Sequence, residues 1–274
     1  MPELPEVETI VRGLAPVLRG RRVQAVWGSG FPLHLNRPVD LRALRAVAVG
    51  QTIRRIARRG KYMLIEVADA GAGVVVHLGM TGRLRVQPAA APRAPHTHVV
   101  FTLDGDDELR FADARRFGWV AAGTPLAEVP ALAALGPDPL SELDAATLRA
   151  LLAASRAPVK SFLLDQRRVA GLGNIYVAEA LFRAGIHPAT PARRAASRAP
   201  ALLQGIRAAL AGGIARRGTT LRDYVDADGQ KGDNARALLV YGRQGAPCSR
   251  CGALIRRRVD GGRATFFCPT CQPR

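Results

Sequence analysis

Apolar positions change their spacing along the chain, and this change divides it into regions. Near the N-terminus Val7, Ile10 and Leu14 recur at helical intervals after a proline, which predicts a first helix. Residues 23–121 then alternate short β-branched runs with glycine and proline, a pattern typical of a β-sandwich or barrel. Beyond the stretch VPALAALGPDPL the apolar period lengthens to about 3.6 residues, so a domain boundary is expected there.

The second half of the chain is predicted to be helical first and to end in short strands. Helices are expected at 145–154, 158–165, 175–184 and 200–216, and strands from about Leu238. The pattern predicts an α+β protein with four parts: an N-terminal β-sandwich domain with its leading helix (1–128), a linker (129–139), a helical domain (140–237) and a C-terminal segment (238–274).

Charge narrows the class of partner. The chain has 40 Lys and Arg against 22 Asp and Glu, a net charge of +18. Clustered cations gain affinity for a phosphate backbone by releasing counterions, so a nucleic acid is favoured over a membrane surface. An apolar fraction of 48% excludes wholesale disorder, and no apolar run is long enough to span a bilayer. The start is acidic and interrupted by prolines, unlike a secretory signal, so we expect a cytoplasmic protein.

The acidic start is unusual in so basic a chain. It reads MPELPEVETI, with carboxylates at Glu3, Glu6 and Glu8. Carboxylates in the first turn of a helix complement its dipole, which accounts for Glu6 and Glu8 but leaves a role for Glu6 in a site open. Glu3 precedes the helix and has no such explanation.

Lysine is scarce, since it provides only three of the 40 cations: Lys61, Lys160 and Lys231. Chance retention is one interpretation. The other is that a lysine persists where chemistry needs an amine that can lose its proton, which a guanidinium cannot do.

All four cysteines lie near the C-terminus in two C-x2-C pairs: Cys248, Cys251, Cys268 and Cys271. This spacing predicts one four-thiolate Zn²⁺ site, which is structural because four protein ligands leave no position for water. Two disulfides are the disfavoured alternative in a cytoplasmic chain. The intervening IRRRVDGGRATFF predicts a basic hairpin that turns at Asp260 and Gly261.

Two further segments suggest phosphate contacts. GLGNIY precedes a predicted helix, where backbone N–H groups can approach a phosphate, although the pattern is weak alone. RRIARRGKY places four arginines and Lys61 close together, and a solvated basic strand is the alternative interpretation.

Seven motifs together resemble formamidopyrimidine-DNA glycosylases, the bacterial repair enzymes for oxidised purines, over nearly the whole chain. They are PELPEVET, GKY, HLGMTG, DARRFG, GLGNIYVAEALF, VYGRQGAPC and the terminal cysteine pairs, in the family's order and spacing. The resemblance implies an N-terminal β-sandwich with an N-terminal helix, a helix-two-turn-helix domain and a four-cysteine zinc-finger hairpin. It also implies a monomer that binds double-stranded DNA with oxidised bases between its domains, in a bacterial cytoplasm at the nucleoid.

The resemblance also implies the catalytic groups. After removal of Met1, the amine of Pro2 would attack C1′ of the damaged nucleotide and form a Schiff base. Glu3 resembles the proton donor to the departing base. Lys61 resembles the cation that assists β-elimination, and Arg263 the hairpin arginine that grips phosphate and assists δ-elimination.

Further residues match the family's DNA contacts. His77 and Asn174 resemble phosphate ligands, with a strand histidine and a helix cap as the alternatives. Three residues match the side chains that fill the hole left by a flipped nucleotide: Met80, Arg115 and Phe117. Another three match the neighbourhood of other DNA contacts: His96, Arg156 and Lys160.

The implied activity is that of a bifunctional DNA glycosylase and AP lyase that removes 8-oxoguanine and formamidopyrimidines by base excision. Two alternatives remain: an endonuclease VIII-like glycosylase for oxidised pyrimidines, and a non-catalytic zinc-hairpin DNA-binding protein. The start PELPE and the intact Met80, Arg115 and Phe117 set argue against the first. The chain departs from the family at Ala114, at RGTTL (217–221) and at DNARALL. The last two departures lie at the ends of the loop at about 218–235, which in the family covers the flipped base.

Overall fold

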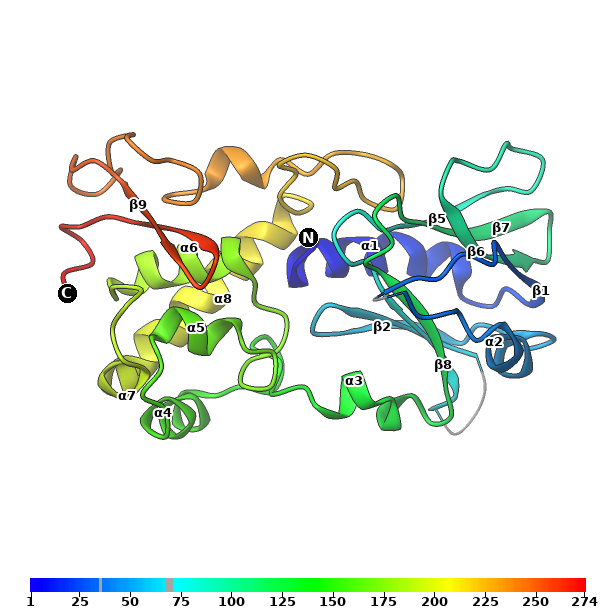
Figure 1. Cartoon of the computed structure of the whole chain (residues 1–274), viewed down its shortest axis with the longest axis horizontal. Coiled ribbons are helices and arrows are strands. Elements are labelled where there is room, and N and C mark those ends of the chain that lie inside the picture. The colour runs from blue at the N-terminus through cyan, green and yellow to red at the C-terminus, as the bar shows by residue number, and fades with distance from the viewer. Residues whose placement is uncertain (35, 68–70) are drawn as a thin grey trace. The chain divides into compact units, whose positions relative to one another are not determined.

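The structure, a computed structural model, describes residues 1–34, 36–67 and 71–274. Its chain divides into two compact units (Figure 1). The first unit contains Met1–Ala133 and Arg217–Gly232, and the second contains Ala134–Arg216 and Asp233–Arg274. The chain therefore returns to the first unit once before it ends in the second.

The predicted N-terminal helix is confirmed as α1 (Leu4–Leu18), with Glu3 as its N-cap. A proline fits the first turn because its missing N–H has no partner there. Val7, Ile10 and Leu14 are buried, as their helical spacing predicted. This apolar face joins the core of the first unit.

The predicted β-sandwich is also confirmed. Two four-stranded sheets have the strand orders β1-β6-β7-β5 and β2-β3-β4-β8, and all pairs are antiparallel. The strands are β1 (Val23–Gly28), β2 (Arg55–Arg59), β3 (Tyr62–Glu66), β4 (Gly73–His77), β5 (Arg83–Pro88), β6 (Thr97–Leu103), β7 (Asp107–Ala112) and β8 (Trp119–Gly123). Met63, Val76, Leu84 and Phe111 are among the residues of the core between them.

Two helices cover the open sides of the sandwich. Helix α1 packs against β2 and β3 of one sheet and β5 of the other, and α2 (Leu41–Ala48) packs against β1, β4 and β8. Helix α2 was not predicted, because it lies within a region dominated by β-branched runs. Its N-cap Asp40 accepts a hydrogen bond from Ala43 N at 2.9 Å, and Leu44 is buried. Unpaired strand edges are liable to pair with other chains, and these helices cover several of them.

The second unit is helical, as predicted, with α6 packed against α5 and α8. Its helices are α4 (Ala145–Ala153), α5 (Val159–Leu164), α6 (Asn174–Ala184), α7 (Ala192–Ala195) and α8 (Ala199–Ala215). The short α7 was not predicted. Shorter helical turns are η3 (Ala196–Arg198) and η4 (Asn234–Ala237) in this unit, and η2 (Leu126–Glu128) and α3 (Pro130–Ala133) in the first unit. In the described part of the chain, no helix has the length and apolarity that a bilayer crossing requires.

The C-terminal hairpin consists of β9 (Arg256–Asp260) and β10 (Arg263–Phe267). Its turn is Gly261–Gly262, one residue later than predicted, and both glycines have positive φ (54° and 73°). A two-residue turn with two positive φ angles strongly favours glycine. Strand β10 packs on α6, and Phe266 joins a small apolar cluster there.

Candidate active site and metal centre

The N-terminal end of α1 is held by the carboxylate of Glu6. Pro2 and Glu3 are buried, and the backbone of Glu3 is extended before the helix begins. Glu6 Oε2 accepts a hydrogen bond from Glu3 N at 2.8 Å, and its Oε1 accepts one from Thr219 N at 2.7 Å. A single buried carboxylate therefore connects the residue after Pro2 with the segment Arg217–Gly232, which we call the returning loop.

The sequence did not indicate this function of Glu6. A carboxylate in a first helical turn carries the same signal whether it complements the dipole or binds a distant backbone N–H. The partner Thr219 lies more than 200 residues away, so only the fold could reveal the contact.

Arginines of β5 also hold the returning loop. Arg83 Nη2 donates to Asp223 O at 3.3 Å, and Arg85 Nε donates to Ala227 O at 3.2 Å. Ala227 itself is buried in the core of the first unit. The sequence did not single out these two arginines, because no local pattern distinguishes them among the 40 Lys and Arg of the chain. The loop is thus tied to the first unit by both backbone carbonyls and a backbone N–H.

Lys61 occupies the two-residue turn between β2 and β3, after Gly60 with φ 57°. It is only 6% exposed, so the amine is withdrawn from bulk water. Its charge is close enough to His77 to lower the pKa of that imidazole. The structure therefore brings Lys61 and His77, two of the predicted site residues, into one neighbourhood of the first unit.

His77, at the end of β4, has a fixed hydrogen-bonding direction. Its Nδ1 accepts from Gly79 N at 3.2 Å, and its ring lies 4.9 Å from that of Tyr62 and 6.5 Å from that of Trp119. Burial, followed by the charge of Lys61, lowers the pKa of His77 to about 4. The imidazole is therefore neutral near pH 7, and its proton lies on Nε2, which can donate a hydrogen bond.

The structure brings Met80, Arg115 and Phe117 onto two adjacent connections that cross between the sheets. Met80 lies between β4 and β5, and the other two lie between β7 and β8. Met80 and Phe117 are 40% and 45% exposed, so both apolar side chains face solvent. The guanidinium carbon of Arg115 lies 4.8 Å from the centre of the Phe117 ring, a cation–π contact.

Asp113 organises these two connections. Its Oδ1 accepts from Thr81 Oγ1 at 2.5 Å and from Arg115 N at 3.2 Å, and its Oδ2 accepts from Gly118 N at 2.7 Å. Gly79 approaches the second connection so closely that a Cβ would lie 2.3 Å from Gly118 N. The sequence motif DARRFG contains this aspartate, but the motif alone assigned it no role. The available signal was a carboxylate two residues before a pair of arginines.

His96 and Arg156 are both exposed, in different units. His96 has a left-handed backbone with φ 62°, and it lines a hollow of about 290 Å³ beside Arg83 and Arg85. These positions leave both side chains available to a phosphate backbone.

In the second unit, Lys160 and Asn174 converge on the hairpin. Lys160 Nζ and Asn174 Nδ2 both donate to Ala264 O, at 3.0 and 2.9 Å, and Lys160 Nζ also donates to Thr265 Oγ1 at 2.6 Å. Burial lowers the pKa of Lys160 to about 8, an effect that Asp260 partly opposes. Arg263, the residue before Ala264, is exposed.

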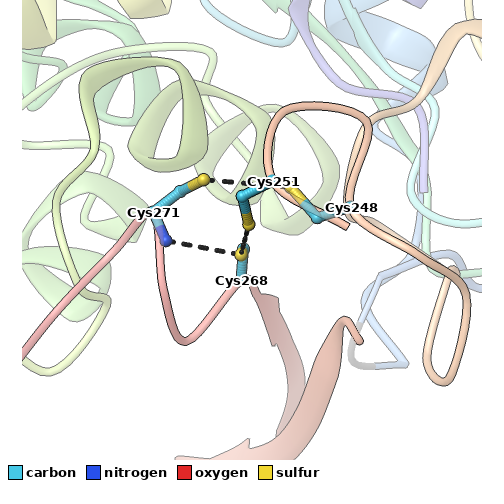
Figure 2. A group of neighbouring side chains, drawn as sticks. All are labelled: Cys248, Cys251, Cys268 and Cys271. Atoms are coloured by element: carbon cyan, nitrogen blue, oxygen red, sulfur yellow. Dashed lines mark hydrogen bonds between the residues drawn. The ribbon is translucent and has the colours of Figure 1, made fainter. Parts of the chain in front are cut away.

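The four cysteines form one cluster at the base of the hairpin (Figure 2). Their sulfur atoms all lie within 4.8 Å of one another, with Cys251 Sγ 3.5 Å from Cys268 Sγ and Cys248 Sγ 3.9 Å from Cys271 Sγ. Tetrahedral thiolates at about 2.3 Å from Zn²⁺ would lie roughly 3.8 Å apart. The sulfurs are too far apart for disulfides. The arrangement fits one structural Zn²⁺.

The predicted catalytic residues are divided between the units. Pro2, Glu3 and Lys61 belong to the first, and Arg263 belongs to the second with the cysteines. Chemistry that used all four would require both units at one substrate.

Comparisons with known proteins agree with this arrangement. Residues 1–120 match the formamidopyrimidine-DNA glycosylase N-terminal domain, 135–225 match the H2TH domain of that family, and 245–274 match a zinc finger found in FPG and IleRS. A formamidopyrimidine-DNA glycosylase of Rhizorhabdus wittichii is 50% identical, with 99% of this chain and 100% of the relative covered. One from Moorella thermoacetica is 49% identical, with 94% of each covered.

Two solved structures are similar over nearly their whole length. A Lactococcus lactis FPG mutant in complex with Fapy-dG containing DNA has a TM-score of 0.89 and 36% identity, covering 100% of both chains. The MutM (FPG) protein of Thermus thermophilus has a TM-score of 0.86 and 41% identity, covering 99% of this chain and 98% of its own.

The sandwich, the helical unit and the thiolate cluster define a DNA-binding repair enzyme with a zinc finger. The chain belongs to the formamidopyrimidine-DNA glycosylase family, and it is accordingly a glycosylase and lyase. The predicted family and fold are thereby confirmed.

Proposed function

We propose that this protein removes oxidised purines, 8-oxoguanine and formamidopyrimidines, from duplex DNA and then cleaves the strand by β,δ-elimination. The product would be a one-nucleotide gap flanked by phosphates. We further propose that it works as a monomer in a bacterial cytoplasm, on the DNA of the nucleoid.

The nucleophile in this proposal is the amine of Pro2, released when Met1 is removed. An α-amino group has a pKa of about 8, against about 10.4 for lysine, so more of it is neutral and nucleophilic at neutral pH. The nitrogen would bond to C1′ as the bond from C1′ to the base breaks. Opening of the sugar ring would then give the Schiff base.

Glu3 is the proton donor in this scheme, since a departing purine must gain a proton. Its position supports the role: it is buried, and the Glu6 carboxylate holds its backbone N–H at 2.8 Å. The backbone of Glu3 is therefore held in place at the start of α1 before DNA binds.

The other residues of the first unit bind the nucleotide and fill the space it leaves. The Lys61 amine would assist loss of the 3′ phosphate, and the Nε2 proton of neutral His77 would bind a phosphate oxygen. The exposed side chains of Met80, Arg115 and Phe117 would enter the stack after the nucleotide is flipped, and His96 would add a phosphate contact.

In the second unit, Arg263 would bind the 5′ phosphate and assist δ-elimination. Asn174 and Arg156 would contact the backbone of the duplex. The four thiolates would hold one Zn²⁺, whose chemistry is structural because its ligands are all protein sulfurs.

The observation that carries the proposal is the arrangement around the N-terminus. A chain of net charge +18 holds two buried carboxylates, Glu3 and Glu6, beside Pro2 and binds one of them to Thr219 N. Helix stability alone does not require the contact between Glu6 and a distant loop.

The test compares one preparation before and after removal of Met1. Protein that retains Met1 has no free proline amine, because the Pro2 nitrogen is then a tertiary amide. We expect it to bind a lesion duplex but neither to release the base nor to form an adduct trapped by borohydride. Treatment with methionine aminopeptidase, followed by mass spectrometry, should restore both activities. Full activity with Met1 in place would mean that another amine is the nucleophile, and Lys61 would be the first candidate.

A panel of duplexes with oxidised purines or oxidised pyrimidines defines the substrate. We expect 8-oxoguanine and formamidopyrimidine duplexes to be cut fastest. Preference for oxidised pyrimidines would instead indicate an endonuclease VIII-like specificity.

A further inference from the structure

Lys160 is a buried amine whose hydrogen bonds lead to the hairpin. It lies on α5 with 2% of its surface exposed. Its Nζ donates to Ala264 O at 3.0 Å and to Thr265 Oγ1 at 2.6 Å. A buried ammonium is costly unless acceptors satisfy it, so these bonds link α5 specifically to the half of β10 that follows the turn.

The bonds belong to a larger network within the second unit. Asn174 Nδ2 also donates to Ala264 O at 2.9 Å, and Thr265 Oγ1 donates to Asp260 Oδ2 at 2.6 Å. Asp260 Oδ2 accepts a further bond from Arg258 Nε at 2.8 Å. The network therefore fixes both strands of the hairpin to α5 and α6.

Arg263 lies within the part of the hairpin that this network holds. It directly precedes Ala264 and pairs with Asp260 across the hairpin. Residues two apart share a face of a strand, so Arg263 and Thr265 project to the same side. Burial is the main cause that lowers the pKa of Lys160, but the charge of Arg263 contributes too, and the two cations are therefore near each other.

We propose that Lys160 is a positioning residue for Arg263: by holding Ala264 O and Thr265 Oγ1, it sets the direction in which the Arg263 guanidinium leaves β10. The inference rests on the role proposed above for Arg263. Lys160 would then act on Arg263 through the hairpin and would not contact the reacting sugar.

The consequence lies in the two elimination steps. In the β step a C2′ proton passes to water or a base and the C3′–O bond breaks, so the 3′ phosphate leaves with the bonding electrons. In the δ step a C4′ proton is lost and the C5′–O bond breaks in the same way. Arg263 would stabilise the departing 5′ phosphate without changing covalently. A misdirected Arg263 would therefore slow the second step more than the first.

The metal and Lys160 hold different parts of the hairpin. Cys268 follows the end of β10 directly, whereas Ala264 lies near the turn. Loss of the amine should therefore leave the thiolate cluster intact, and the effect of Lys160 can be separated from that of zinc.

The experiment measures the ratio of β,δ to β product from a duplex with a preformed abasic site, in single turnover. A saturating excess of enzyme keeps the duplex bound through both steps, so weaker binding does not change the ratio. We compare Lys160→Met, which keeps the length but cannot donate, with Lys160→Arg, which can still donate to both acceptors. Arg263→Ala is the reference, and Arg149→Met is a control that removes an exposed cation from α4. Zinc content is measured for each.

We expect Lys160→Met to lower the ratio roughly tenfold or more, the usual scale for loss of a charged hydrogen bond. Lys160→Arg should restore much of it, and Arg149→Met should not change it. In the Lys160→Met and Arg263→Ala double variant the ratio should be no lower than in Arg263→Ala alone, because the lysine acts through the arginine. Thr265→Val removes one acceptor and should lower the ratio less, which keeps the test available if Lys160→Met fails to fold.

The outcomes separate the two proposals. An unchanged ratio in Arg263→Ala would overturn the role of that arginine itself. A lowered ratio in Arg263→Ala with none in Lys160→Met and Thr265→Val would overturn the positioning role alone. Loss of zinc from Lys160→Met would also overturn it, by showing that the lysine supports the metal site.

Discussion

The returning loop of the first unit and the hairpin of the second are both held on their units, but by different chemistry. The loop is tied by side chains to its backbone: Glu6 accepts from Thr219 N, and Arg85 donates to Ala227 O. The hairpin has the thiolate cluster at its base and the Lys160 and Asn174 bonds near its turn. One segment therefore depends on protein groups alone, and the other depends on a metal as well.

This difference implies that the two ends of the proposed chemistry can fail separately. Pro2 and Glu3 lie beside the Glu6 carboxylate, whereas Arg263 lies on the metal-dependent hairpin. Loss of metal should affect phosphate binding first, and loss of Glu6 should affect base release first. Three measurements test whether the two segments are as independent as their contacts indicate.

The largest effect is expected from loss of zinc. Chelation, or Cys268→Ala, removes the link at the base of the hairpin, so duplex affinity should fall at least about 100-fold as its cationic contacts are lost. Fluorescence anisotropy at fixed salt measures this. Limited proteolysis should cut the hairpin while the returning loop stays protected. A metal-free protein with full affinity would refute the zinc assignment, and exposure of the returning loop would refute the independence of the two segments.

Glu6→Gln should have the next largest effect. Glutamine offers one acceptor oxygen and one NH2 group, so Glu3 N or Thr219 N loses its partner, at a cost of about 1–3 kcal/mol in the free energy of unfolding. We expect base excision to slow more than tenfold, with zinc content unchanged. Trypsin should cut more readily at Arg222, which lies exposed in the returning loop.

Glu8→Gln is the matched control for that variant. Glu8 is also on α1, but it pairs with Arg12 and Arg58 and not with the loop. Its replacement should leave loop protection and excision close to wild type. Equal loss in both variants would mean that helix α1, and not the Glu6 contact, governs the loop.

The third measurement concerns the effect of acid on the first unit alone. His77 has a folded pKa of about 4, below the value of about 6.5 in an unfolded chain. Between these values the unfolded state binds more protons, so the free energy of unfolding falls as pH is lowered from 6.5 to 4, by about 2 kcal/mol at pH 5.

Denaturant unfolding of wild type and His77→Gln at pH 7.5 and pH 5 isolates this contribution. The wild type should lose about 2 kcal/mol more than the variant on acidification, and the difference should persist after zinc is removed. Equal losses would mean that His77 is protonated in the folded protein at pH 5, and they would remove the argument for a neutral Nε2 donor.

The sequence predicted the elements whose signal is periodic or local. Residues of α1 and α6 keep their helical spacing, the β runs keep their alternation, and the cysteine pairs keep their metal spacing. Helix α2 was missed although Asp40 is a good N-cap, because its eight residues lie among strands. The hairpin turn was predicted one residue early because either Asp-Gly or Gly-Gly can make such a turn.

The site was harder to predict where a residue acts through a distant backbone. The contact of Glu6 with Thr219, and those of Arg83 and Arg85 with the returning loop, depend on register and packing that no local pattern contains. For Lys160, scarcity drew attention to the residue, but the direction of its amine toward Ala264 emerged only with the fold. The roles of the individual site residues stay predictions for the experiments above.

The close approach of Gly79 to Gly118 has a mechanical consequence. The two connections that carry Met80, Arg115 and Phe117 touch through their backbones, and Asp113 bonds across them, so neither can bend without displacing the other. A duplex that contacts these connections would therefore meet three side chains on a rigid support, and a force on one of them would be transmitted to the other two. Lengthening either connection by even one residue should therefore displace all three side chains together.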